Sequence, residues 1–180
     1  MISHFYEDIY GYSLYSAQGM LLEHLLDILK NKRLTIAEIG VYKGRMTAMW
    51  NVELINRNVD YEYYAIDHFL GSDGILDASY DNALLNLKTI ENRIKLIQND
   101  SISESEKYED EFFDIVYIDA SHDYESVKKD LIHWYPKVKT GGIICGDDYS
   151  SRWKGVIEAV DEFFTSPVGF ILHQWFYKKI

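Results

Sequence analysis

Acidic side chains recur at one kind of position in this sequence, at or just after the end of a short apolar run. A single acidic turn is usually a solvated turn or a helix cap. A series of such turns favours a shared site instead, because carboxylates bind amines, hydroxyls and hard cations. The acidic residues at these positions are Glu38, Asp67, Asp100, Asp119, Asp147 and Asp148.

A histidine accompanies the most apolar of these runs, since His122 follows Asp119 by three residues. An imidazole has an ordinary pKa of ~6.5, so it can take a proton from a hydroxyl near neutral pH. The alternative is structural, with Asp119 and His122 capping the helix that follows. The surrounding acids favour catalysis by His122. His4 and His173 lie near the two ends of the sequence with no partner that the sequence identifies.

Two glycines, Gly40 and Gly44, follow the first apolar run and allow the chain to turn close to a ligand. They do not form a three-glycine dinucleotide fingerprint, and no Lys-Ser/Thr pair for phosphate follows them. NAD and ATP are therefore poor candidates. A nucleoside with an amine and ribose hydroxyls but no phosphate suits Glu38 and Asp67, and S-adenosylmethionine has those groups.

Hydrophobic spacing alternates between strand and helix patterns, and this alternation predicts the elements that position the acids. Strands are expected at 34–39, 61–66, 94–98, 112–118 and 141–146, and helices at 16–30, 44–56, 76–90, 124–135 and 156–164. A closing β-hairpin is expected from 168–172 and 175–177. The predicted fold class is α/β, a Rossmann-like, doubly wound, mostly parallel sheet flanked by helices with an antiparallel C-terminal edge. Ligands bind such sheets at the carboxyl ends of the strands, which is where the acids lie.

A length of 180 residues, 47% of them hydrophobic, and the lack of a linker-like tract predict one domain over residues 1–180. Residues 1–30 are expected to be an N-terminal helical segment that also provides a lid over the site. The tyrosines that suggest this lid are Tyr6, Tyr10, Tyr12 and Tyr15.

Charge and composition exclude several partners. The formal net charge of −11 repels nucleic acid backbones and anionic lipid. The single cysteine, Cys145, excludes an internal disulfide and a multi-thiolate metal site. We find no signal-peptide pattern and no apolar stretch of transmembrane length, so a cytoplasmic protein with no membrane and no nucleic acid partner is expected.

Four motifs together resemble class I S-adenosylmethionine-dependent methyltransferases, of the metal-dependent small-molecule and sugar O-methyltransferase type that includes macrocin O-methyltransferase. Ala37-Glu-Ile-Gly-Val-Tyr-Lys-Gly44 is similar to the first motif of this family, and Ala65-Ile-Asp67 to its second-strand acid. Val116-Tyr-Ile-Asp-Ala-Ser-His-Asp-Tyr124 resembles the fourth-strand signature of Asp, two residues, His, one residue and Tyr. Gly141-Gly-Ile-Ile-Cys-Gly-Asp-Asp-Tyr149 matches the fifth-strand region.

The resemblance implies a role for each strand end. Glu38, Gly40 and Gly44 would surround the methionine part of the cofactor, and Asp67 would bind the ribose hydroxyls. Asp100 and Ser101 would lie near the adenine. A carboxylate set would hold a divalent ion, Mg²⁺ or Mn²⁺, and His122 would be the general base. The residues of that metal set are Asp119, Asp147 and Asp148.

The sequence thus predicts an S-adenosylmethionine-dependent O-methyltransferase acting on a hydroxylated small molecule, with a sugar or glycosylated metabolite as the narrower expectation. Two alternatives stay open: a metal-dependent, hydroxylase-like enzyme on the same scaffold, and a non-catalytic cofactor-binding subunit. A homo-oligomer is one expected alternative to a monomer.

Overall fold

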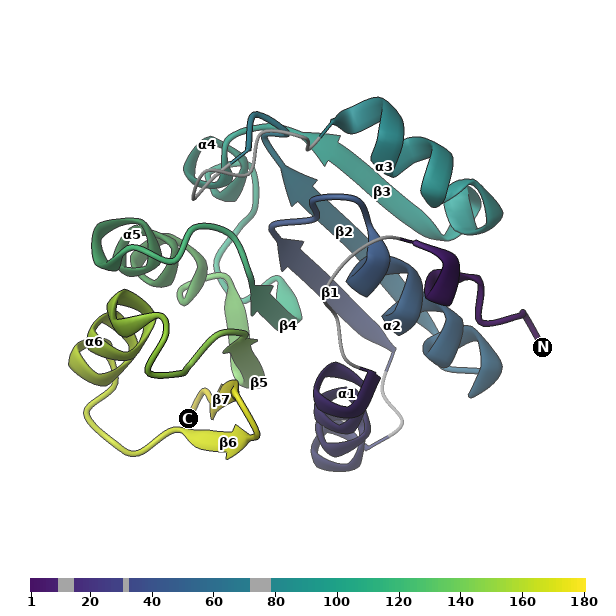
Figure 1. Ribbon diagram of the computed structural model, residues 1–180. Helices are drawn as coiled ribbons and strands as arrows, with labels where there is room; N and C mark the ends of the chain where they lie inside the picture. Colours follow the sequence, from purple (N-terminus) through teal and green to yellow (C-terminus); the bar gives the residue numbers. More distant parts are fainter. Residues whose placement is uncertain (10–14, 31–32, 72–78) are drawn as a thin grey trace.

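A mixed seven-stranded sheet organises the computed structural model, which describes residues 1–9, 15–30, 33–71 and 79–180 (Figure 1). The strands are β1 (Leu34–Ile39), β2 (Tyr61–Asp67), β3 (Ile94–Gln98), β4 (Phe113–Ile118), β5 (Val138–Gly146), β6 (Gly169–Ile171) and β7 (Gln174–Lys178). The helices are α1 (Tyr15–Leu29), α2 (Arg45–Asn56), α3 (Tyr80–Asn86), α4 (Ser101–Ser105), α5 (Tyr124–Trp134) and α6 (Lys154–Phe163). Two 3-10 turns, η1 (Phe5–Asp8) and η2 (Lys88–Arg93), complete the described elements.

The strand order is β3-β2-β1-β4-β5-β7-β6. The first five strands run parallel to one another, whereas β7 pairs antiparallel with both β5 and β6. This arrangement confirms the predicted fold class, including its antiparallel C-terminal edge. The order along the sheet reverses between β1 and β4, and such a switch point leaves a crevice at the carboxyl ends of the strands.

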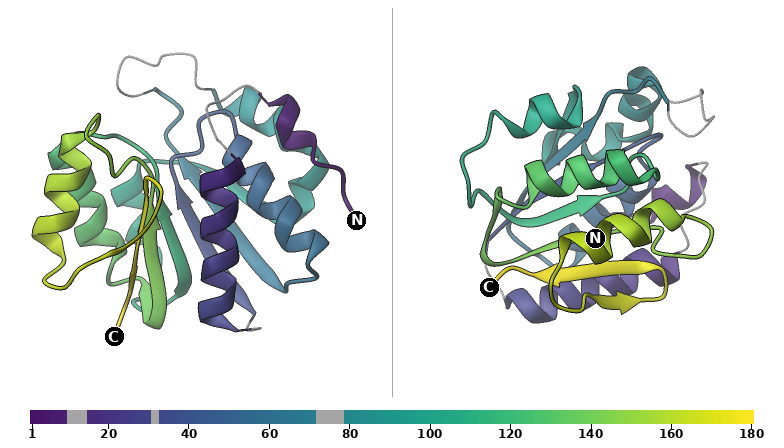
Figure 2. Two further views of the ribbon diagram at one scale, coloured as in Figure 1. Left: turned by 60° about the horizontal axis from the view of Figure 1, so that its bottom comes forward. Right: turned by 90° about the vertical axis from the view of Figure 1, so that its left-hand side faces the viewer.

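Helices cover both faces of the sheet (Figure 2). One apolar core lies under α1, α2 and α3 and contains Trp50, while the other lies under α5 and α6 and contains Trp134. Both indoles are fully buried. Because both faces are covered, the central strands are almost continuously apolar rather than alternating, and all six residues of β4 are buried.

Three elements differ most from those that the hydrophobic spacing predicts. α4 was not expected from hydrophobic spacing, because its five residues form one short turn capped by Asp100. β5 begins at Val138, three residues before the predicted start. The helix expected over 76–90 is divided in its described part into α3 and η2, and residues 76–78 lie outside the described residues.

Of the four tyrosines that suggest a lid, Tyr6 is the one whose side chain the structure describes. Tyr6 lies in η1, which packs against α2, and it is only 3% exposed within the core. Tyr10 and Tyr12 lie outside the described residues, as does the side chain of Tyr15. In the described part of the chain, no helix has the length and apolar character needed to span a membrane.

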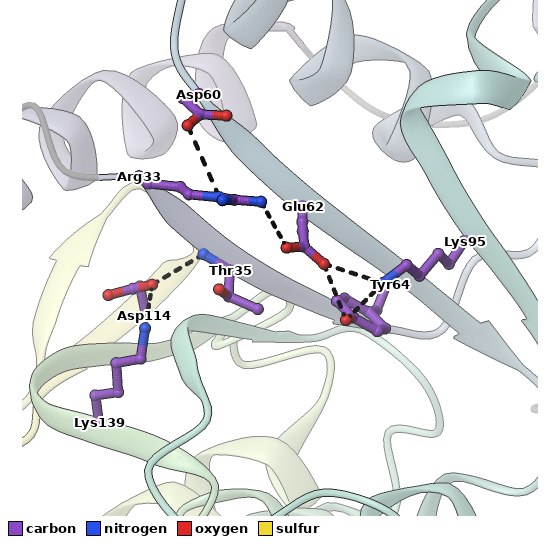
Figure 3. Close-up of polar contacts among 8 residues, drawn as sticks. All are labelled: Arg33, Thr35, Asp60, Glu62, Tyr64, Lys95, Asp114 and Lys139. Atoms are coloured by element: carbon purple, nitrogen blue, oxygen red, sulfur yellow. Dashed lines mark hydrogen bonds and ion pairs between the residues drawn. The ribbon is translucent and has the colours of Figure 1, made fainter.

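Acidic residues near the amino ends of the strands form ion pairs with lysine and arginine side chains (Figure 3). The Asp114 carboxylate, for example, accepts hydrogen bonds from Lys139 Nζ at 2.7 Å and from the Thr35 amide at 2.9 Å. Glu62 pairs with Arg33 at 2.8 Å and with Lys95 at 3.0 Å. The acids at this end are thus accounted for by structural ion pairs, in contrast to those at the carboxyl ends.

Candidate active site

A cavity of about 320 Å³ opens at the carboxyl ends of the parallel strands. Residues of β1 and β2 and of the segments that follow β1, β3, β4 and β5 line it, together with residues of α1, of α2 and of the β6–β7 turn. Eight of the ten residues predicted from the sequence line this one cavity: Glu38, Gly40, Asp67, Ser101, Asp119, His122, Asp147 and Asp148. Gly44 and Asp100 are not among its described lining residues.

Gly40 permits the ends of β1 and β4 to approach each other. Its φ of +95° lies in the region that favours glycine, and a Cβ atom there would come within 2.0 Å of the Asp119 carbonyl oxygen. No side chain fits between these two strand ends. Gly40 therefore shapes the floor of the cavity by letting the two strand ends lie close together. This close backbone approach explains a glycine at position 40 even without contact to a ligand.

Asp67, at the end of β2, holds the turn that follows β1. One carboxylate oxygen accepts hydrogen bonds from the amides of Val41 and Tyr42, both at 2.8 Å. The other oxygen accepts from the Phe69 amide at 2.6 Å. Because three amides hold this carboxylate, its orientation toward the cavity is set before any ligand binds.

Glu38 is buried in the floor of the cavity, with 1% of its surface exposed. Burial raises the pKa of its carboxyl group to about 8, although hydrogen bonds from Thr47 and Tyr63 work in the opposite direction. The Tyr63 hydroxyl donates to Glu38 Oε2 at 2.8 Å. A pKa of about 8 means that Glu38 is mostly protonated at neutral pH, so it can donate a hydrogen bond as well as accept one.

The remaining residues predicted to bind the cofactor have structural partners. Gly44, with φ +83°, precedes α2, and a Cβ there would meet the Leu87 side chain at 2.9 Å. Asp100 caps α4 by accepting hydrogen bonds from the amides of Ile102 and Ser103. The Ser101 hydroxyl donates to Asp130 at 2.5 Å. Asp100 therefore shapes the turn after β3, while Ser101 is part of the cavity wall.

A compact group of possible metal ligands lies at the ends of β4 and β5. One ligand atom each from Asp119, His122 and Asp148 falls within 4.8 Å of the others. His122 Nε2 lies 2.8 Å from Asp148 Oδ2 and 4.0 Å from Asp119 Oδ1. The imidazole stacks on the Trp153 ring at a centroid distance of 4.1 Å, which fixes its plane.

Asp147 belongs to a neighbouring set of contacts, outside this group of three. Its Oδ2 accepts from Gln18 Nε2 at 3.1 Å, and its Oδ1 accepts from the Asp148 amide at 2.6 Å. His173 Nε2 lies 3.2 Å from the same Oδ1. Of the three aspartates predicted to hold the metal, Asp147 thus lies beside the group of three, with partners on both of its carboxylate oxygens.

Sequence reasoning missed Gln18 and His173 as parts of this cavity. Gln18 lies in α1, and His173 lies in the turn between β6 and β7, so neither follows a parallel strand. No local signal marks them, because only the packing of α1 and the hairpin beside β5 brings them to Asp147. Arg45, the first residue of α2, also lines the cavity and was not singled out.

The crowding of carboxylates fits a site for a cation. Burial, with the charges of Asp147 and Asp148 adding to it, raises the pKa of Asp119 well above its usual range. Burial also raises the pKa of Asp147. A bound cation would offset both effects, and an oxygen-rich set with one imidazole suits Mg²⁺ or Mn²⁺.

The sequence and the fold were compared with known protein families, curated proteins and solved structures. Residues 37–149, from β1 to the turn after β5, match the model of a family described as a methyltransferase domain. A comparison with curated protein sequences found no significant match.

Solved structures share the fold at low sequence identity. The O-methyltransferase NovP is similar at 18% identity with a TM-score of 0.75, over 90% of this chain and 78% of that one. CalS11, a TDP-rhamnose 3′-O-methyltransferase, gives 16% identity and a TM-score of 0.62 over 88% and 77%. MycE methyltransferase, in a complex with Mg, SAH and mycinamycin VI, gives 19% identity and a TM-score of 0.63 over 94% of this chain and 50% of its own. Because the model of the methyltransferase domain covers more than half of the sequence, the chain belongs to this family of S-adenosylmethionine-dependent methyltransferases.

Proposed function

We propose that this protein is an O-methyltransferase that uses S-adenosylmethionine and a divalent ion to methylate a hydroxylated small molecule, in particular a sugar or a glycosylated metabolite. One observation carries the proposal: a single cavity joins the glycine turn and Asp67 to the Asp119, His122 and Asp148 group. A methyl donor and an acceptor hydroxyl can therefore meet within one cavity, as direct transfer requires.

The residues at the ends of β1, β2 and β3 suggest how the cofactor would lie in the cavity. The turn at Gly40, with Glu38 in its floor, would surround the methionine part, while Asp67 would accept hydrogen bonds from the ribose hydroxyls. The wall formed by Ser101 would lie beside the adenine. Asp100 contributes to that wall by capping α4, and Gly44 contributes by allowing α2 to begin against Leu87. When bound, S-adenosylmethionine supplies an electrophilic methyl group on a sulfonium.

The divalent ion would be held by Asp119 and Asp148, with Asp147 fixed beside them by Gln18 and His173. A bound Mg²⁺ or Mn²⁺ supplies Lewis acidity, which lowers the pKa of a coordinated hydroxyl. The oxygen ligands favour these ions over thiolate-seeking metals.

His122 would accept the proton that the acceptor hydroxyl loses. Its ring is held by the Trp153 stack and by Asp148, so it can keep one orientation through the reaction. The same position also suits a metal ligand, and the two roles differ in a measurable way, because a ligand contributes to metal affinity whereas a base does not.

The acceptor class has support from the similar structures. CalS11 is described as acting on TDP-rhamnose, and MycE was solved with mycinamycin VI. The net charge of −11 also argues against a nucleic acid acceptor.

Calorimetry with S-adenosylhomocysteine and with Mn²⁺ tests the proposal directly. We expect the protein to bind both, and we expect chelation to abolish methyl transfer to a panel of sugars and glycosides without abolishing S-adenosylhomocysteine binding. Asp119→Asn should weaken Mn²⁺ binding, while Asp110→Asn, an exposed acid paired with Lys137, should not. Full activity after exhaustive chelation would refute the metal, and no binding of S-adenosylhomocysteine would refute the function.

A further inference from the structure

We infer that His173 selects the acceptor by accepting a hydrogen bond from a second hydroxyl, on the carbon next to the one that is methylated. The inference rests on the proposed function and narrows its acceptor to a vicinal diol, as in a sugar ring. His173 is in this sense a specificity-determining residue, because it contacts the substrate beside the reacting oxygen and takes no part in methyl transfer.

Two histidine–aspartate pairs line the same cavity, and their aspartates are consecutive residues after β5. His122 Nε2 lies 2.8 Å from Asp148 Oδ2. His173 Nε2 lies 3.2 Å from Asp147 Oδ1. Successive side chains of an extended strand point to opposite faces, but Asp148 has a φ of +59°, so the chain leaves the strand conformation there. This turn lets both carboxylates line the cavity, with the second pair beside the group assigned to the reaction.

The chain on either side of His173 is held in place. Leu172 and His173 form the two-residue connection between β6 and β7. The His173 carbonyl oxygen accepts a hydrogen bond from the Tyr149 amide at 3.0 Å. Gln174, the next residue, is fully buried, and its Oε1 accepts from the Tyr117 hydroxyl at 2.9 Å. The imidazole therefore reaches the cavity from a short turn that is fixed at its backbone and at the residue that follows.

The contact with Asp147 determines what the His173 ring offers to a ligand. Asp147 accepts from Gln18 Nε2 at 3.1 Å and from the Asp148 amide at 2.6 Å, so it acts as an acceptor toward its neighbours. His173 Nε2 then donates to it, and a neutral imidazole that donates from one nitrogen has a lone pair on the other. Among the described residues Nδ1 has no hydrogen-bond partner, and the side chain is 36% exposed. His173 thus presents an acceptor nitrogen that a hydroxyl can use.

The short separation of the two pairs indicates which hydroxyl this is. Asp148 and His122 belong to the group where the methylated hydroxyl is proposed to bind. Asp147 is joined to Asp148 by one peptide bond, so the ring that it holds lies next to that point and meets a donor of the same substrate molecule. A substrate with hydroxyls on neighbouring carbons can use both places. A substrate with one hydroxyl leaves Nδ1 without a donor and loses a hydrogen bond.

Monodeoxy analogues of the acceptor test the inference. The acceptor that reacts best in the panel of sugars and glycosides is compared with its monodeoxy analogues, one for each remaining hydroxyl. We expect the unaltered protein to disfavour the analogue without the neighbouring hydroxyl about 10-fold in kcat/KM, as for one lost hydrogen bond. His173→Phe keeps the ring and removes both nitrogens, so it should lower kcat/KM for the parent acceptor about 10-fold and reduce this preference to within about twofold.

Two further variants and two affinities keep the test specific. His173→Gln retains an amide donor for Asp147 and an oxygen acceptor, so it should keep most of the preference. His133→Ala removes an exposed imidazole of α5 that is not among the described lining residues, and it should leave the preference unchanged. His173→Phe should bind Mn²⁺ and S-adenosylhomocysteine within about threefold of the unaltered protein, because neither ligand is assigned to His173.

Equal losses of kcat/KM for the parent acceptor and all analogues would mean that His173 only supports Asp147, and they would overturn the inference. The full preference retained in His173→Phe, or no preference in the unaltered protein, would overturn it as well. If His173→Phe does not fold, His173→Ala is measured in its place under the same expectation. If the unaltered protein methylates no acceptor of the panel, it is the proposed function that fails.

Discussion

Single carboxylates in this protein perform structural and chemical tasks at once. Asp67 accepts three amide hydrogen bonds and also faces the cavity, and Asp147 is held on both oxygens while it adjoins the metal group. The sequence predicted which acids would gather, because their spacing after strands is visible. It did not predict which partners hold them, since those amides and side chains come from other segments.

Asp67→Ala should therefore damage both the turn and ligand binding. Loss of three amide hydrogen bonds is expected to lower the free energy of unfolding by about 2 to 3 kcal/mol. S-adenosylhomocysteine affinity should fall at least about 10-fold, because a charged partner of the ribose is lost as well. Urea unfolding and calorimetry measure the two effects, and an affinity equal to that of the unaltered protein would remove Asp67 from the cofactor site.

His122→Ala separates the two roles that its position allows. As a general base, His122 contributes about 10² to 10⁴ to the single-turnover rate of methyl transfer, while Mn²⁺ affinity stays within about threefold. The rate should be measured below the apparent pKa of the unaltered enzyme, with an acceptor found in the sugar panel. A loss of Mn²⁺ binding that accounts for the loss of rate would make His122 a ligand instead.

At the scale of elements, the spacing of hydrophobic residues predicted strands more accurately than helices. The bounds of β1 and β3 agree with the prediction to the residue. Those strands are apolar runs bounded by polar turns, so their ends are readable. α4 was missed because it depends on one capping carboxylate, Asp100, rather than on periodicity. The positions of α1 and the β6–β7 turn at the cavity were equally unreadable, since they follow from packing between distant segments.

Because β1 and β4 lie close together at Gly40, replacing Gly40 by alanine should destabilise the fold more than the same change at Gly141. Gly141 has φ +80° with nothing within 4 Å of an added Cβ, so Gly141→Ala should cost only the backbone strain of about 1 to 2 kcal/mol. Gly40→Ala adds a collision with the Asp119 carbonyl and should cost about 3 kcal/mol or more. Urea unfolding of both variants checks this, and equal losses would mean that the strand ends can separate without cost.

At the scale of the whole molecule, acidic side chains have different surroundings at the two ends of the sheet. Acids near the amino ends pair with lysine and arginine. Those at the carboxyl ends share one cavity, in which Arg45 is the one arginine or lysine among the described lining residues. Asp130 differs from both groups, because it lies in α5, is only 5% exposed and accepts a hydrogen bond from Ser101 of α4. Burial raises the pKa of its carboxyl group to about 6, although the hydrogen bond from Ser101 lowers it.

The stability of the molecule should therefore depend on pH through Asp130. Because the folded state holds this proton more tightly than the unfolded state, stability is lost as pH rises from the unfolded value of 3.8 to about 6, and then levels off. Asp130→Asn removes this loss, so between pH 4 and 7.5 it should gain about 2 to 3 kcal/mol relative to the unaltered protein. Urea unfolding at both pH values measures the difference, and parallel pH profiles would contradict the expectation.

The insertion of β7 between β5 and β6 has a consequence for synthesis on the ribosome. Gln18 emerges early, but its partner Asp147 is made 129 residues later, and His173 later still. Until residues 174–178 are made, β5 has an unpaired edge, and Trp175 is not yet in place against Gly146. A nascent chain in which β5 has been made but residues 174–178 have not therefore presents an open strand edge and an unfinished cavity, and it becomes able to bind its ligands only after β7 is in place.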